Sequence, residues 1–201
     1  MTFSKRVFDV LCAIGLIMLL WPLLLIVIFV ILLRDGRPVF YVSERMKTPT
    51  KGFNLVKFRT MKPVAVDSGV SGGDKSDRIT GTGRFLRRTR LDETPQLWNV
   101  LKGDISFVGP RPPLRQYVDA YPEIYREVMK SRPGITGLAS IYFSAYEERL
   151  LSRCSSRAET DDVYRRICIP RKAQLDLIYQ KNRSICLDGL LMLRTVFKRL
   201  R

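Results

Sequence analysis

Histidine is absent from all 201 residues of the chain. Its absence excludes the commonest general base, the catalytic triads that depend on an imidazole, and histidine-ligated metal centres. What remains for catalysis is the chemistry of carboxylates, cationic side chains and hard metal ions that bind oxygen.

Cysteine is sparse, and its spacing carries no motif. The four cysteines contain no C-x-x-C pair, which argues against a zinc ribbon or a dithiol redox pair. The sequence therefore predicts reduced thiols without a function of their own. They are Cys12, Cys154, Cys168 and Cys186.

A phosphate-binding loop of the Walker type is also missing. Gly69, Gly72 and Gly73 lie in a stretch rich in Pro, Ser, Gly and Asp, but no Gly-Lys-Ser or Gly-Lys-Thr ending follows them. Because residues 62–81 show neither a helical nor a strand period, the sequence predicts a surface loop there.

Negative charge is scarce: 35 Lys and Arg residues face 19 Asp and Glu residues, and the net charge is +16. Such a balance favours an anionic partner, which can be nucleic acid, a lipid surface or a phosphorylated metabolite. A membrane-tethered nucleic-acid binder and a basic scaffold without catalysis are therefore two alternatives to an enzyme. No nucleic-acid-binding module is recognisable in the sequence, so we expect no nucleic-acid partner.

One long apolar run lies near the amino terminus. Residues 10–33 carry no charge, and this run of about 24 residues is long enough to span a bilayer as a helix. Pro22 lies at its centre, where it removes a backbone donor and bends a helix. Cations favour the cytoplasmic side and flank both ends, so a re-entrant hairpin competes with an ordinary single-pass anchor. The flanking cations are Lys5, Arg6, Arg34 and Arg37.

After the apolar run, the sequence predicts an α+β domain that is mostly helical with a few short strands. The expected boundary separates a membrane segment, residues 1–35, from a catalytic domain, residues 36–201. The last helix is basic and amphipathic, which suits either an anionic membrane surface or an ordinary packed helix. Strands are expected over residues 39–42, 53–59 and 105–108, and helices over residues 83–90, from 92–94 to 103, 121–130, 170–181 and 185–200.

Two adjacent carboxylates, Asp92 and Glu93, mark the strongest candidate site. Pro95 is tolerated only in a first helical turn, so a helix should begin between Asp92 and Thr94, and Gly103 should end it. Neighbouring helical residues point about 100° apart, so the two acids should have separate roles. An ionised Asp92 can attack phosphorus and form an aspartyl-phosphoryl intermediate, and either acid, above all Glu93, can hold Mg²⁺. The competing interpretation is a pair that only complements the helix dipole.

Basic residues before and after this pair are candidates for binding phosphate. The prolines of Pro110-Arg111-Pro112 fix the backbone path and would present a guanidinium to a phosphate or a planar base, unless this is only a stiff surface loop. Four further cations are candidates for neutralising charge on a transferring phosphoryl group: Lys57, Arg59, Arg87 and Arg88.

These stretches together resemble the bacterial sugar transferase family, the small monotopic phosphoglycosyl transferases. The resemblance covers nearly the whole chain, and the motifs between residues 91 and 112 are highly specific in combination. The matching stretches are Lys57-Phe58-Arg59-Thr60-Met61, Arg87-Arg88-Thr89, Leu91-Asp92-Glu93 with Pro95-Gln96-Leu97, Asn99 to Asp104, Ser106 to Pro112, and Arg132 to Leu138.

The resemblance implies an enzyme that moves a sugar 1-phosphate from a UDP-sugar to a polyprenol phosphate such as undecaprenyl phosphate, with release of UMP. Asp92 would be the nucleophile of a covalent intermediate, and Glu93 would assist it through Mg²⁺ or proton handling. Pro110, Arg111 and Pro112 match the family's uridine-recognition loop.

The resemblance also implies a location and an architecture. A re-entrant membrane helix bent at Pro22 would pack on a small catalytic domain with amphipathic interfacial helices. The protein would lie on the cytoplasmic face of the bacterial inner membrane, bind its anionic surface, form a homodimer, and start the assembly of a capsule, O-antigen, exopolysaccharide or glycoprotein glycan.

Some positions depart from the family pattern. Thr94 replaces the leucine that usually follows the Asp-Glu pair, Arg90 replaces a common serine, and Trp21 precedes Pro22 where some members carry serine. Residues 140–143 read Ser-Ile-Tyr-Phe where many members have Gln-Val-Asn-Gly before an arginine. This last difference bears on which sugar the chain accepts.

Overall fold

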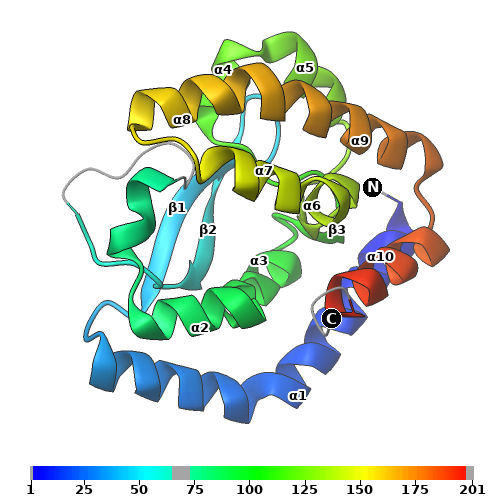
Figure 1. Cartoon of the computed structure of the whole chain (residues 1–201). Coiled ribbons are helices and arrows are strands. Elements are labelled where there is room, and N and C mark those ends of the chain that lie inside the picture. Colours follow the sequence, from blue (N-terminus) through cyan, green and yellow to red (C-terminus); the bar gives the residue numbers. More distant parts are fainter. Residues whose placement is uncertain (1, 65–72, 198–201) are drawn as a thin grey trace.

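The computed structural model describes residues 2–64 and 73–197 (Figure 1). The fold is mostly helical with a few short strands, as expected. The α-helices are α1 (Phe3–Arg34), α2 (Gly81–Thr89), α3 (Gln96–Lys102), α4 (Arg115–Ala120), α5 (Pro122–Val128), α6 (Leu138–Tyr142), α7 (Ser144–Leu151), α8 (Arg157–Val163), α9 (Ile169–Asn182) and α10 (Ile185–Phe197). The strands are β1 (Phe40–Met46), β2 (Gly52–Phe58), β3 (Ser106–Val108) and β4 (Gly134–Thr136).

The strands form two separate pairs. β1 and β2 make an antiparallel hairpin in which Tyr41 faces Lys57, and β3 and β4 make a short parallel pair in which Ser106 faces Gly134. The expected strands are confirmed, although β1 runs to Met46 instead of ending near residue 42. β4 was not expected, because three residues are too few to establish an alternating pattern.

The predicted loop over residues 62–81 is wrong in part. Residues 73–78 form the 3₁₀ helix η1 (Gly73–Arg78), and Met61 forms a β-bridge with Ile79. The rest of that prediction, residues 65–72 with Gly69 and Gly72, lies outside the described residues. Short 3₁₀ segments lack the long apolar period by which a helix is found in a sequence.

The carboxyl-terminal third contains more helix than the sequence predicted. The expected helix over residues 170–181 is α9, but a π-helical segment, η3 (Tyr164–Cys168), joins it to α8 in one helical run. Pro170 lies in the first turn of α9. The wider π turn before Pro170 lets the run continue although proline lacks a backbone donor, and for this reason the proline did not mark the true beginning of the helix.

Helix α1 contains the whole apolar run, with Pro22 inside it. It is long and apolar enough to cross a membrane by length and composition. Figure 1 shows that α1 changes direction midway, as expected of a helix with a central proline. Many of its apolar side chains are exposed, including Leu25 at 56% and Phe29 at 62%. Whether this bend makes α1 re-entrant in a bilayer stays a prediction.

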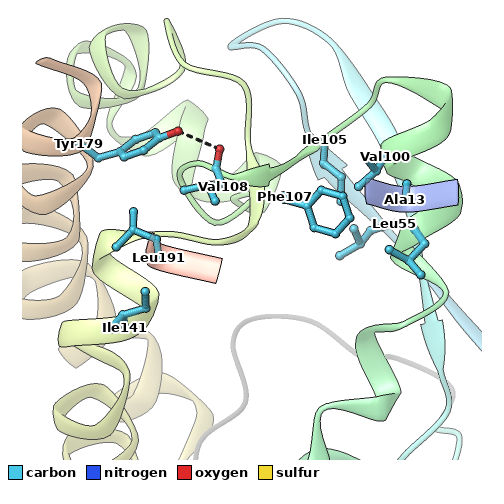
Figure 2. Close-up of a cluster of buried hydrophobic side chains, with 10 residues drawn as sticks. Ala13, Leu55, Val100, Ile105, Phe107, Val108, Ile141, Tyr179 and Leu191 are labelled. Atoms are coloured by element: carbon cyan, nitrogen blue, oxygen red, sulfur yellow. Dashed lines mark hydrogen bonds between the residues drawn. The ribbon is translucent and has the colours of Figure 1, made fainter. Parts of the chain in front are cut away.

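Both halves of α1 also pack on the rest of the chain. Ala13 is fully buried in a cluster with Val100 and Phe107 (Figure 2), whereas Val27 and Ile31 are buried in another cluster with Phe58 and Leu86. Small and branched side chains on one face of α1 therefore belong to the core, and many apolar side chains elsewhere on α1 stay exposed.

Polar contacts fix the first turns of α1 to the domain. The Arg6 guanidinium donates hydrogen bonds to the carbonyl oxygens of Val100 and Leu101 at the end of α3, at 2.5 and 2.6 Å. Lys5 pairs with the buried carboxylate of Asp188 on α10 at 2.5 Å. A cation at the carboxyl end of a helix satisfies carbonyl groups that have no partner within the helix.

The parallel pair β3 and β4 brings two glycines into direct backbone contact. A Cβ atom on Gly134 would lie 2.2 Å from the backbone nitrogen of Gly109, and one on Gly109 would lie 2.2 Å from the carbonyl oxygen of Arg132. Only glycine allows this approach. The crossing fixes the start of the loop Pro110–Pro112, because the backbone nitrogen of Gly134 donates to the Pro110 carbonyl at 2.8 Å.

Candidate active site

Asp92 and Glu93 lie in a turn that precedes α3. The 3₁₀ segment η2 (Leu91–Glu93) follows Arg90, whose φ of +61° puts it in the left-handed region. The sequence predicted a helix start between residues 92 and 94, but α3 begins at Gln96. The prediction that Gly103 ends the helix is confirmed by its left-handed conformation. The left-handed Arg90 turns the chain so that both carboxylates are buried.

Helix α3 is held against the β1–β2 hairpin by one buried amide. Asn99 Nδ2 donates to the carbonyl oxygen of Asn54 at 2.8 Å, and its Oδ1 accepts from the backbone nitrogen of Val56 at 3.1 Å. Asn99 is 1% exposed. This side chain therefore sets the position of the Asp92 turn relative to Lys57 on β2.

Glu93 is held by two arginines. Its Oε1 accepts from Arg90 Nη1 and from Arg111 Nη2, both at 3.0 Å. Burial alone would raise the pKa of Glu93, but the charges of Arg111 and Arg90 outweigh it and lower the pKa to about 2. Glu93 is therefore ionised at neutral pH, and proton handling, one of its two expected roles, does not suit it.

The pKa of Asp92 shifts in the opposite direction from that of Glu93. Burial and the charge of Glu93 raise its pKa, against the opposing charges of Lys57, Arg90 and Arg87. Its Oδ1 is buried and has no hydrogen-bond partner among the described residues. A buried carboxylate oxygen without a partner is costly for the fold, and it is free to bond to phosphorus or to a cation.

Lys57 of β2 and Arg87 of α2 bring positive charge to Asp92, as predicted. Burial, followed by the charges of Arg111, Arg45 and Arg87, lowers the pKa of Lys57 to about 8. Cations that weaken each other's protonation in this way form a site that favours an anion.

Two cations of this cluster were missed by the sequence analysis. Arg90 was noted as a departure from the family, yet it makes an ion pair with Glu93. Arg45 lies on β1, and its Nε is buried without a hydrogen-bond partner among the described residues. Strand alternation places Tyr41 and Arg45 on the same face, and this signal could have found Arg45 if β1 had been extended beyond residue 42.

The other two predicted phosphate-binding residues, Arg59 and Arg88, differ from Lys57 and Arg87 in their surroundings. Arg59 is buried, and its Nη2 donates to the carbonyl oxygens of Asp35 and Gly36 at 2.6 and 2.7 Å. Arg88 is exposed on α2, next to the half-buried Arg87. The contacts of Arg59 favour a structural role at the exit of α1 over the predicted contact with phosphate.

The loop Pro110–Pro112 is fixed by buried prolines and by one ion pair. Both prolines are buried, and the Arg111 side chain is 44% exposed while it pairs with Glu93. The Glu93 carboxylate thus holds the predicted uridine-recognition loop beside the turn that carries Asp92.

The carboxylate oxygens of Asp92 and Glu93 are the candidate ligands for the predicted Mg²⁺. Among the described residues, no three His, Cys, Asp or Glu side chains gather closely enough to hold a metal ion. The unpartnered Oδ1 of Asp92 fits as one oxygen ligand, whereas Oε1 of Glu93 already accepts from two arginines. Mg²⁺ commonly uses one or two carboxylates and takes its other ligands from water and substrate phosphates, so this set fits the ion if Asp92 is the ligand.

The residues that diverge from the family pattern form α6 and the beginning of α7. Ile141 and Phe143 are buried in two different hydrophobic clusters, and the exposed Tyr142 hydroxyl accepts a hydrogen bond from Arg194 of α10. The divergent residues thus place two apolar side chains in the core, and Arg194 brings a guanidinium beside Tyr142.

Comparison with known proteins finds several sugar transferases among the relatives of this chain. A phosphotransferase of Aeromonas hydrophila, named for UDP-N-acetylgalactosamine and undecaprenyl phosphate, is 34% identical over 96% of this chain and 43% of its own length. The uncharacterized sugar transferase EpsL of Bacillus subtilis is 44% identical over 68% of this chain and 67% of its own length. The UDP-glucose:undecaprenyl-phosphate glucose-1-phosphate transferase of Klebsiella pneumoniae is 34% identical over 96% of this chain and 39% of its own length.

The chain therefore spans less than half the length of the Aeromonas and Klebsiella relatives. The model of one protein family matches residues 1–201, the full length of the chain. The description of this family is bacterial sugar transferase. The chain belongs to the bacterial sugar transferase family.

Proposed function

We propose that the chain transfers a sugar 1-phosphate from a UDP-sugar to a polyprenol phosphate through a covalent intermediate on Asp92. The observation that carries the proposal is the buried Oδ1 of Asp92, which lacks a partner among the described residues and lies in a cluster of cations. The names of the Aeromonas and Klebsiella relatives support the same class of reaction.

In the first step, an Asp92 carboxylate oxygen attacks the phosphorus that bears the sugar. A bond forms between this oxygen and phosphorus, the bond from phosphorus to the bridging diphosphate oxygen breaks, and UMP leaves with the electron pair. In the second step, a phosphate oxygen of the polyprenol phosphate attacks the same phosphorus. The acyl phosphate bond breaks, Asp92 regains its carboxylate, and the sugar remains on a polyprenyl diphosphate.

The basic side chains stabilise the charge that moves in both steps. Lys57 and Arg87 would contact the phosphoryl oxygens, since their charges already act on Asp92. Glu93 would hold Arg111, so that the loop Pro110–Pro112 can receive the uridine. Mg²⁺, when bound by Asp92 and the diphosphate, would add positive charge at the leaving group.

The membrane location follows from α1 and the exposed side chains of α10. We propose that α1 enters and leaves the cytoplasmic leaflet of a bacterial inner membrane as a bent hairpin, with α10 at the interface. Leu193 and Phe197 of α10 are 56% and 61% exposed, and Arg194 lies between them. Such a basic amphipathic helix binds an anionic surface, and the active site would then be within reach of a lipid phosphate.

The reaction is tested by UMP release. Purified protein in nanodiscs would be supplied with undecaprenyl phosphate, Mg²⁺ and single UDP-sugars, beginning with UDP-N-acetylgalactosamine and UDP-glucose, the donors in the relatives' names. We expect UMP from at least one donor in proportion to the lipid acceptor. No UMP from any UDP-sugar would refute the proposed function.

Replacing Lys57 with arginine should change how donor binding depends on pH. The pKa of Lys57 is lowered to about 8, so its charge is present below this pH and lost above it. In the wild type, KM for the UDP-sugar should rise as pH increases beyond about 8. Lys57→Arg stays protonated and should lack this alkaline rise. An identical alkaline rise in both proteins would exclude Lys57 from phosphate binding.

Replacing Arg59 with lysine should affect stability instead of substrate binding. The variant loses at least one of the two hydrogen bonds to Asp35 and Gly36, at a cost of about 2 kcal/mol in the free energy of unfolding. KM for the UDP-sugar should stay within about twofold, because these contacts do not face the carboxylates. Thermal melting and KM measured together would check this. Unchanged melting with a much higher KM would assign Arg59 to phosphate binding after all.

A further inference from the structure

A basic cavity lies beside the first turn of α1, away from Asp92 and Glu93. Its volume is about 580 Å³, within the usual range for binding a small ligand. Thr2 and Phe3 of α1 line one side. Four cations line the remainder: Arg6, Lys47, Lys102 and Arg132.

Two of these cations, Arg6 and Arg132, lie beside Gly103. A Cβ atom on Gly103 would lie 3.3 Å from Nη1 of Arg132 and 3.4 Å from Cζ of Arg6. Burial and the charge of Arg6 lower the pKa of Arg132. Two guanidinium groups held this close repel each other, and an anion that contacts both would relieve the repulsion.

The nearby carboxylate of Asp104 does not balance this charge. Its oxygens lie 3.3 Å from Lys47 Nζ and 3.5 Å from Lys102 Nζ. Arg6 is bound to neutral carbonyl oxygens of α3, which leaves its full charge in the cavity. The charge of Asp9 also acts on Arg132, but Asp9 and Asp104 together offset only two of the four cations, so the cavity is positive overall. It also lies at the positive end of the α1 dipole, which favours an anion further.

The cavity is separate from the proposed active site. Asp92 precedes α3, whereas Lys102 and Gly103 end it. α3 has 7 residues, so at 1.5 Å per residue its two ends are roughly 10 Å apart. A UDP-sugar held at Asp92 would not fill this cavity with its reacting phosphate.

An apolar stripe leads away from the cavity along α1. Phe3, which lines the cavity, is followed by Val7 and Leu11 at intervals of four residues, and their exposures are 85%, 40% and 64%. Residues four apart lie on one helical face. The basic cavity is thus continuous with an exposed apolar face of α1 that suits an acyl chain.

We propose that this cavity binds the phosphate group of an anionic phospholipid, with an acyl chain along Phe3, Val7 and Leu11. The lipid would hold the amino-terminal end of α1 at the interface. Basic pockets beside membrane helices are known to bind acidic head groups. The site does not depend on the proposed reaction, because it uses none of its residues.

The test measures lipid binding directly. The detergent-purified full chain would be titrated with phosphatidylglycerol or phosphatidylcholine, and the bound lipid counted by native mass spectrometry. We expect one phosphatidylglycerol to bind preferentially. The double variant Lys102→Gln with Arg132→Gln should bind it about thirty-fold more weakly, since each cation contributes about 1 kcal/mol near an anionic lipid.

A matched variant controls for total charge. Arg126→Gln with Arg166→Gln also removes two positive charges, from side chains that are 64% and 72% exposed and outside the cavity, and it should bind the lipid like the wild type. An equal loss in both double variants would overturn the proposal. So would full displacement by millimolar inorganic phosphate, which would identify a site for free anions.

A folding control is available within the same cavity. If the Arg132 variant melts below the wild type, Lys47→Gln with Lys102→Gln replaces it, because these lysines end in ion pairs at the cavity edge. This second variant should also bind phosphatidylglycerol at least tenfold more weakly. Unchanged binding in a folded variant would contradict the lipid site.

Discussion

Asp92→Asn should lower the turnover of the sugar transfer by at least about 10³-fold while leaving the protein folded. Asparagine has the shape of aspartate but cannot form the acyl phosphate. The turnover is therefore lost because the nucleophile is removed. The exposed Asp119 on α4 supplies the control, because Asp119→Asn removes an equal charge and should keep full activity. UMP release measured with both variants checks the expectation, and activity in Asp92→Asn above about a tenth of wild type would contradict it.

The same substitution should raise the melting temperature. Burial and Glu93 raise the pKa of Asp92, so the folded state opposes its ionised form. Wherever Asp92 is ionised in the unfolded chain, its raised pKa in the folded state reduces the free energy of unfolding, and a neutral amide removes this penalty. Lower activity with higher stability is a common sign of a residue kept for function. A destabilised Asp92→Asn would instead point to a structural carboxylate.

A rival mechanism gives the same loss of turnover. If Asp92 only held a metal ion, the lipid phosphate would attack the UDP-sugar directly and no covalent intermediate would form. The two mechanisms differ when the lipid acceptor is left out. Protein incubated with UDP-sugar and Mg²⁺ should then carry a sugar phosphate on the tryptic peptide Leu91–Lys102, detected by mass spectrometry. Failure to trap it with a donor that does turn over would favour direct attack.

Gly134→Ala should have the largest effect on stability, a loss of more than about 4 kcal/mol in the free energy of unfolding. The new Cβ would lie 2.2 Å from the backbone nitrogen of Gly109, 2.6 Å from the carbonyl carbon of Val108 and 2.8 Å from the carbonyl oxygen of Thr136. All three atoms belong to the backbone, so no side chain can rotate away. The β3–β4 pair must separate, and the loop that carries Arg111 would lose its support.

Gly189 in α10 provides the matched control. No atom lies within 4 Å of the position that its Cβ would take, and alanine is the better helix former by about 1 kcal/mol. Gly189→Ala should therefore melt at or above the wild-type temperature, whereas Gly134→Ala should melt far below it or fail to fold. Thermal melting of both variants in the same detergent checks this, and equal melting temperatures would show that the two strands can move apart freely.

The sequence predicted local features well, because each depends on one or two residue types. Pro22 indicated a bend in α1, Gly103 indicated the end of α3, and the prolines around Arg111 indicated a rigid loop. The candidate nucleophile Asp92 and its cations Lys57 and Arg87 were found from their types and from the family resemblance, and the structure brings them together.

The remaining features depend on contacts between distant residues. Glu93 accepts from Arg111 across 18 positions, and Arg6 donates to Val100 across 94. No local sequence pattern predicts hydrogen bonds between residues so far apart in the chain. The helices between α6 and η3 are short and owe their stability to packing, so their sequence lacked a clear period. Arg45 was missed because its strand was ended too early.

The burial of Ala13 and the contacts of Arg6 have a consequence for biosynthesis. Val100, which packs with Ala13 and accepts from Arg6, follows Arg6 by 94 residues. At 5–20 residues per second, a ribosome needs roughly 5–20 s to make this partner after it has made Arg6. During that interval the apolar helix has no core to join, and lipid or a chaperone must cover it. In the proposed membrane location, insertion of α1 would precede the completion of the hydrophobic core, and the proposed active site would assemble only after the chain had reached the bilayer.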